Sequence, residues 1–142
     1  MGGHGDAMVP MTRFTTISGI AIEHFLSAEK IDEIIQRTRT GGAEILALKG
    51  NSSAYGAPAA AIAEMVEAIA YNRKSVLPTV AFIQGEYGQE EMAIGVPAVL
   101  GEYGMEKVIE LELNDLELGY FNTSVASTRE ELATLSTITN KT

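Results

Sequence analysis

The sequence predicts an α+β domain in which a helical half is followed by an antiparallel sheet and a closing helix. Between Ser27 and Tyr71, apolar side chains recur at helical spacing. Residues 75–113 then hold β-branched and aromatic runs separated by glycine-bearing turns, which are typical of strands. A capping pattern at Asn114 begins a last helix. Helices and strands that are segregated along the chain in this way indicate the α+β class.

The composition fits one globular domain with one core. The chain has 142 residues, of which 46% are hydrophobic and 20% charged, a balance that favours a globular protein over a disordered one. It contains no apolar run of membrane-spanning length. The start MGGHGD lacks the basic and then apolar plan of a secretory signal. We therefore expect a cytoplasmic protein that does not enter a membrane.

Charge and cysteine content exclude several classes of function. The formal net charge of −9 repels a phosphate backbone, so we expect no nucleic-acid partner. Because the chain has no cysteine, it forms no disulfide, thiolate metal site or cysteine nucleophile. His24 has no ligand-like neighbours in the sequence, and no metal site is expected.

The helical half is predicted to begin after a short β element. Residues 11–23 are rich in Thr, Ile and Phe and broken by Gly19, which indicates a strand pair or a bent strand. Ser27 is a suitable N-cap for the helix that follows. Gly41-Gly42 is expected to interrupt that helix, with Ala43–Leu48 as a possible second piece.

A second helix is predicted after a polar turn at residues 49–56. It covers Ala57–Tyr71, with Pro58 in its first turn, where proline is tolerated. Its many alanines predict close packing against a neighbour. The larger apolar side chains share one face, and they are Ile62, Met65, Val66 and Ile69.

The sheet is predicted to have three strands, at Ser75–Gln84, Met92–Leu100 and Lys107–Leu113. Turn residues at 85–88 and 102–104 separate them, and Pro78 indicates an edge strand or an irregular start. Asn114, with Glu117 three residues later, matches a capping box that begins the long C-terminal helix.

The most distinctive segment is MGGHGDAMVP, which presents His4 between glycines. Histidine can both give and take a proton, because its ordinary pKa lies near neutrality. The flanking glycines permit positive φ and a close ligand. Asp6 could orient the ring or cap the next element. The residues alone also fit a mobile glycine-rich chain start, so both interpretations stay open at this point.

This segment resembles the catalytic-histidine segment of the malate dehydrogenases of the lactate-dehydrogenase-like type. Further segments occur in that family's order and spacing: RFTTISGI, RTRTGGAEILAL, SSAYGAPAAAIAEMVEAI, RKSVLPTVAFIQGEYG and GVPAVLGEYGMEKVIELEL. The resemblance covers residues 1–139. It implies the C-terminal, substrate-binding domain of the lactate/malate dehydrogenase family, with an antiparallel sheet packed against helices and a long C-terminal helix.

The resemblance also implies site residues. His4 corresponds to the acid/base that takes the proton of the substrate 2-hydroxyl while a hydride passes to NAD. Ser53 corresponds to a small hydroxyl residue near the bound dicarboxylate, malate or oxaloacetate. From the residues alone, Ser53 is equally well a polar turn residue before the next helix. Gly5 and Asp6 match the motif and are expected to have structural roles.

In that family a Rossmann half supplies the NAD-binding glycine loop, the aspartate partner of the histidine and two substrate-binding arginines. This sequence has no such loop after a strand. Its arginines lie in other contexts and are expected to be surface charges; they are Arg13, Arg37, Arg39, Arg73 and Arg129. We therefore expect residues 1–142 to be a single C-terminal domain without its Rossmann partner, inactive alone, with His4 loosely tethered.

Two alternatives stay open. Beside the malate dehydrogenase interpretation, these are the same domain from a lactate dehydrogenase and a non-catalytic module that associates with itself. The family forms dimers and tetramers partly through this domain, and a large exposed apolar face promotes association. A homo-oligomer is expected in either case.

Overall fold

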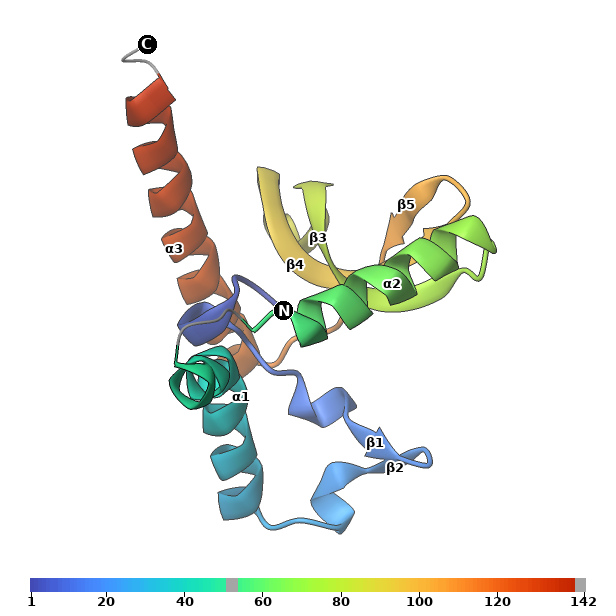
Figure 1. Cartoon of the computed structure of the whole chain (residues 1–142), viewed down its shortest axis with the longest axis vertical. Helices are drawn as coiled ribbons and strands as arrows, with labels where there is room; N and C mark the ends of the chain where they lie inside the picture. The colour runs from blue at the N-terminus through green and yellow to red at the C-terminus, as the bar shows by residue number, and fades with distance from the viewer. Residues whose placement is uncertain (51–53, 140–142) are drawn as a thin grey trace.

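The computed structural model describes residues 1–50 and 54–139, and it confirms the predicted α+β class (Figure 1). Short 3-10 helices are labelled η. Across the described residues, the elements in chain order are η1 (Gly5–Ala7), η2 (Thr12–Phe14), β1 (Thr16–Ile17), β2 (Ile20–Ala21), η3 (Ile22–His24), α1 (Ala28–Lys49), α2 (Gly56–Ala70), β3 (Ser75–Gln84), η4 (Glu86–Gly88), β4 (Glu90–Gly101), β5 (Gly104–Val108) and α3 (Asp115–Thr139).

The strand pair expected within residues 11–23 is present as a small hairpin. β1 and β2 are antiparallel, with Thr16 opposite Ala21 and Ile17 opposite Ile20. Gly19 lies in the turn with φ of 82°, a left-handed conformation that glycine adopts without steric cost.

α1 runs without a break through Gly41-Gly42, so the predicted interruption is wrong. Neither glycine has positive φ, and a glycine inside a helix costs only about 1 kcal/mol, which a long helix tolerates. The helix ends at Gly50, where φ is 73°. At its start, the predicted N-cap is confirmed, because Ser27 accepts a hydrogen bond from the backbone N–H of Lys30 at 3.4 Å.

α2 forms as predicted, and the close packing expected from its alanines is present at Ala68. Ala68 is 1% exposed, whereas Ile62 is 60% and Val66 56% exposed. The helix lies against β4 (Figure 1). A helix approaches a strand most closely through its small side chains, and here the larger apolar residues point to solvent.

The three-stranded sheet has the order β3-β4-β5 and is antiparallel throughout. Pro78 lies opposite Pro97 in the first pair, and β3 is an edge strand, as Pro78 predicted. Gly101 pairs with Gly104 across the second turn.

The third strand was predicted too far along the chain, at residues 107–113. β5 ends at Val108, although Ile109 still donates a backbone hydrogen bond to Pro97 at 2.8 Å. Beyond that point the chain leaves the sheet, and the backbone N–H of Leu111 donates to the hydroxyl of Tyr87 at 2.9 Å. A tertiary contact therefore replaces the strand ladder.

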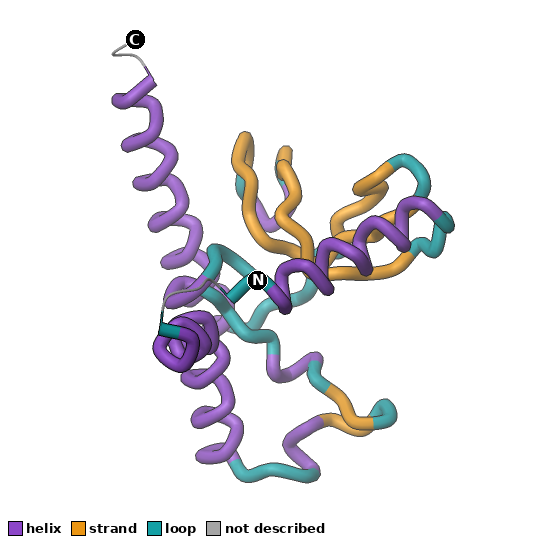
Figure 2. The backbone as a smooth tube through the Cα atoms, viewed as in Figure 1, coloured by secondary structure: helices purple, strands orange, loops and turns teal. Residues whose placement is uncertain are grey.

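The core lies between α3 and the sheet, and Figure 2 shows α3 running past the strand ends. The Tyr87 and Phe121 rings pack there with centroids 5.3 Å apart. None of the described helices is long and apolar enough to cross a membrane. The buried cluster consists of Ala81, Ile83, Met92, Ile94, Val96, Val108, Phe121 and Val125.

Candidate functional site

The segment that carries His4 is held from two sides. The Gly2 N–H donates to the Gly95 carbonyl at 2.8 Å and the Gly95 N–H donates to the Gly2 carbonyl at 3.1 Å, so the segment joins the free side of β4. The Gly3 N–H donates to Ser124 Oγ of α3 at 2.7 Å. The expectation that His4 is loosely tethered is therefore wrong.

Residue 2 has room for glycine only. Gly2 has a φ of 81°, and a Cβ there would lie 2.3 Å from Ser124 Oγ. Met1 and Val9 close the loop, because the Val9 N–H donates to the Met1 carbonyl at 2.9 Å. Val9 is 3% exposed and anchors the far end of the segment.

His4 itself is exposed and extended, with φ of −91° and ψ of 149°. It occupies the N-cap position of η1, and its side chain makes no capping hydrogen bond there. Asp6 follows in the first turn of η1 and is exposed. Its role in orienting the His4 ring stays a prediction.

His4 opens on an apolar groove of about 640 Å³. Along β3 the groove is lined by the consecutive residues 76–80. Among the described residues that line it, His4 alone carries an ionisable side chain. The apolar wall is formed by Met8, Met11, Phe14, Val76, Pro78, Val80, Pro97, Ile109 and Leu111.

Tyr87 holds part of the groove wall through its hydroxyl. Its hydroxyl donates to the Ile109 carbonyl at 2.7 Å and accepts from the Leu111 N–H, two residues of the groove. Tyr87 has a φ of 54°, which is rare for an aromatic residue, and burial raises the pKa of its hydroxyl. Sequence reasoning identified the turn at this place but missed the bridge.

None of the arginines lines the groove in the described part of the chain. Arg13 pairs with Glu117, Arg37 with Glu44 and Arg73 with Glu67, each at 2.9 Å. Arg39 donates to the Met8 carbonyl at 3.0 Å, and Arg129 donates to Gln89 Oε1 at 3.3 Å. The expected surface position is confirmed for Arg129 and for the three ion-paired arginines, which are all exposed, whereas Arg39 is half-buried.

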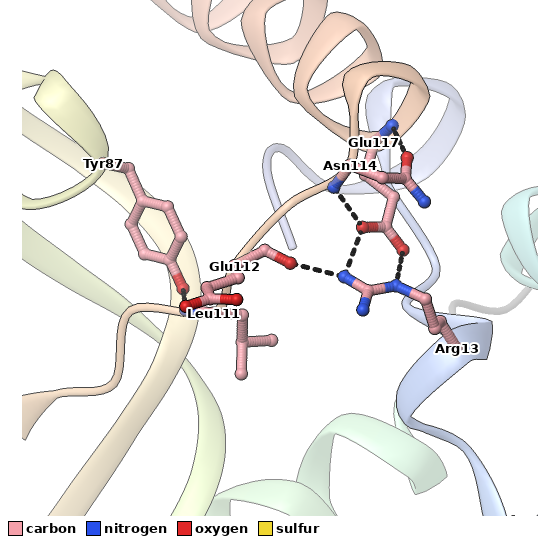
Figure 3. Close-up of polar contacts among 6 residues, drawn as sticks. All are labelled: Arg13, Tyr87, Leu111, Glu112, Asn114 and Glu117. Carbon is pink, nitrogen blue, oxygen red and sulfur yellow. Dashed lines mark hydrogen bonds and ion pairs between the residues drawn. The ribbon is translucent and has the colours of Figure 1, made fainter.

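The Arg13–Glu117 pair joins the chain before β1 to the start of α3 (Figure 3). Glu117 also closes the predicted capping box. Its carboxylate accepts from the backbone N–H of Asn114 at 2.9 Å, and the backbone N–H of Glu117 donates to Asn114 Oδ1 at 2.9 Å. The hydrogen bond from Arg13 holds the pKa of Glu117 below its ordinary value.

Two residues that hold the segment before His4, Gly95 and Ser124, were missed by sequence reasoning. Gly95 did carry a signal, because an isolated glycine inside a strand pattern often marks a close backbone approach. Ser124 carried none, because a serine inside a helix usually faces solvent. The other predicted site residue, Ser53, lies outside the described residues.

Comparisons with known proteins identify the family of this chain. The family model for the lactate/malate dehydrogenase α/β C-terminal domain matches residues 1–138. The chain belongs to the lactate/malate dehydrogenase family. As the resemblance implied, it carries that family's C-terminal domain.

Its relatives include the malate dehydrogenase of Thioalkalivibrio sulfidiphilus, which is 60% identical over 132 residues, covering 93% of this chain and 43% of that protein. The malate dehydrogenase structure from Salinibacter ruber has a TM-score of 0.96 at 43% identity and covers 99% of this chain and 46% of that one. A lactate dehydrogenase of Cryptosporidium parvum, complexed with lactic acid and nicotinamide adenine dinucleotide, has a TM-score of 0.87 at 36% identity, covering 91% of this chain and 42% of that one. The chain thus spans less than half the length of these proteins.

Proposed function

We propose that this chain is the C-terminal domain of an NAD-dependent malate dehydrogenase, in which His4 is the acid/base. The observation that carries the proposal is a single ionisable side chain, exposed on a fixed segment, over an apolar groove. Curated relatives at 48–60% identity are named malate dehydrogenases, and among the solved structures malate dehydrogenases match at 38–44% identity and lactate dehydrogenases at 31–36%. This difference favours malate over lactate as the substrate.

The proton would move at the His4 imidazole. In malate oxidation the ring takes the proton of the substrate 2-hydroxyl, and in the reverse direction it returns that proton to the 2-oxygen of oxaloacetate. NAD, when bound, would accept the hydride that leaves C2 of malate. The fixed backbone on either side of His4 limits how far the ring can move from the substrate oxygen, and positioning of this kind contributes strongly to rate.

The described residues do not fit the pyrophosphate of NAD. The groove offers no Lys or Arg side chain among the described residues, and the sequence has no GxGxxG loop between a strand and a helix. The two carboxylates of malate also need positive partners, for which arginine is best suited. We therefore place the cofactor site and the substrate-binding arginines in an N-terminal Rossmann domain, the part of the relatives that this chain does not match.

On this proposal, residues 1–142 by themselves are inactive. Loss of one electrostatic stabiliser commonly reduces the rate about 100- to 1,000-fold, and here several are lost together with the cofactor site. Ser53 is proposed as a second residue near the bound dicarboxylate, on the family resemblance alone. The full protein is proposed as a cytoplasmic oxidoreductase of carboxylic acid metabolism that serves the tricarboxylic acid cycle.

We also propose a homo-oligomer. On α2, Ile62 and Val66 are exposed by 60% and 56%, and Phe82 of β3, which does not line the groove, is exposed by 56%. Apolar surface of this extent promotes association. Light scattering at high concentration tests this proposal, because a monodisperse monomer would contradict it. An oligomer without dehydrogenase activity in the assay below would instead support the non-catalytic module.

A fusion protein tests the proposed activity. It joins the N-terminal part of the Thioalkalivibrio sulfidiphilus relative to residue 1 of this chain. The fusion protein should oxidise NADH with oxaloacetate, while the unfused chain should show neither this activity nor saturable NAD binding. A folded but inactive fusion protein, or an active unfused chain, would overturn the proposal.

A further inference from the structure

Ser124 is a buried polar residue whose hydroxyl serves the His4 segment. It lies on α3 between the core residues Phe121 and Val125 and is 1% exposed. Its Oγ accepts the backbone N–H of Gly3, the residue directly before His4, at 2.7 Å. A buried backbone N–H without an acceptor is costly, so this hydroxyl has a defined partner in an otherwise apolar surrounding.

Gly95 supports the same segment from the sheet. Its two backbone hydrogen bonds to Gly2 leave so little space that a Cβ on Gly95 would lie 2.5 Å from the Gly2 carbonyl oxygen. The segment is thus held between α3 and β4. We call Gly95 and Ser124 the clamp.

We propose that Ser124 is a positioning residue for His4, acting with Gly95 through the backbone of residues 2 and 3. The inference rests on the proposed acid/base role of His4. The hydrogen bond from the Gly3 N–H to Ser124 Oγ ties this segment to α3 at the residue directly before His4. An acid/base group must stay close to the substrate atom with which it exchanges the proton. A small displacement therefore lowers the rate of the chemical step more than it lowers substrate affinity.

Kinetics of the fusion protein provide the first test. Ser124→Ala should lower kcat by about tenfold or more, with the KM for oxaloacetate changed by less than about twofold. Ser124→Cys keeps the volume and a weak acceptor, and it should recover part of the loss. Thr123→Ala is the matched control, because Thr123 is exposed on the same helix and bonds only within it. Equal kcat for Ser124→Ala and Thr123→Ala would overturn the proposal.

Amide hydrogen exchange of the unfused chain provides a second test that does not require activity. The Gly3 amide should be protected in the parent chain and should exchange at least about tenfold faster in Ser124→Ala, with core amides such as Ile94 unchanged. Gly95→Ala should accelerate the same amide from the other side of the clamp. Unchanged Gly3 exchange in both variants would refute the clamp. An inactive parent fusion protein would count against the proposed function, and the exchange result would still decide whether the clamp exists.

Discussion

Arg13 and Glu117 lie 104 positions apart and are joined by two hydrogen bonds, from Nε to Oε1 at 3.1 Å and from Nη2 to Oε2 at 2.9 Å. Arg13 also donates to the Glu112 carbonyl, and Glu117 accepts from the N–H of Asn114 (Figure 3). The capping box of α3 and the segment before β1 therefore form one unit. Phe14, next to Arg13, lines the groove, so this unit also shapes the candidate site.

Glu117 variants should separate the cap from the charge. Glu117→Ala removes the side-chain acceptor for the Asn114 N–H and should lower the free energy of unfolding by about 1 kcal/mol. Glu117→Gln keeps an acceptor but loses the ion pair and should be affected less, since exposed pairs contribute little. Urea denaturation measures both, with the exposed Glu131→Ala on the same helix as control. Equal stability of all three variants and the parent would contradict the structural role of Glu117.

The same contact predicts a pH dependence. The Arg13 hydrogen bond holds the pKa of Glu117 below its ordinary 4.5. Because the folded state binds this proton less readily than the unfolded state, the stabilisation is present above pH 4.5 and is lost as the pH falls through the folded-state pKa. Between pH 7 and pH 3, the free energy of unfolding should therefore fall more steeply in the parent than in Glu117→Gln. Parallel curves would refute the assignment.

Tyr87→Phe should loosen the groove wall. The substitution keeps the ring against Phe121 but removes the hydroxyl that bridges Ile109 and Leu111. We expect a loss of about 1–3 kcal/mol in the free energy of unfolding, because a partly buried N–H and carbonyl lose their partner. Tyr103→Phe is the control, since Tyr103 is 83% exposed in a turn. If both variants unfold alike, the bridge does not contribute.

The glycines of α1 offer a stabilising change. A Cβ at Gly42 meets no atom within 4 Å, and the residue is helical, so Gly42→Ala should raise stability by about 0.5–1 kcal/mol. A Cβ at Gly104 also meets no atom within 4 Å, but its φ is 83°, so Gly104→Ala should be destabilising. Thermal unfolding should shift in opposite directions for the two variants. Shifts of the same sign would contradict the backbone explanation.

Local patterns were readable from the sequence because their partners lie close together along the chain. The capping box joins Asn114 to Glu117, and β3 begins at Ser75 and ends at Gln84, the bounds that its β-branched run predicted. Predictions failed where distant contacts override local preference. Beyond Val108, where β5 ends, the backbone N–H of Leu111 bonds to the Tyr87 hydroxyl, and α1 continues through Gly41-Gly42 despite the local preference of glycine.

The candidate site divides in the same way. The glycine-flanked motif identified His4, but what holds it was hidden, because Ser124 lies 121 positions from Gly3. No periodicity connects two residues that far apart. The sequence showed Gly95 only as a glycine within a strand, and nothing in it indicated that Gly2 is the residue that pairs with it on β4.

The most direct test of the central claim is kcat for oxaloacetate reduction by the fusion protein carrying His4→Asn. His24→Asn is the matched control, because His24 is also exposed but lies in η3, outside the groove. If His4 transfers the proton, His4→Asn should lower kcat by about 100- to 10,000-fold, while His24→Asn leaves it within about twofold. A His4→Asn fusion protein that keeps the parental kcat would contradict the account.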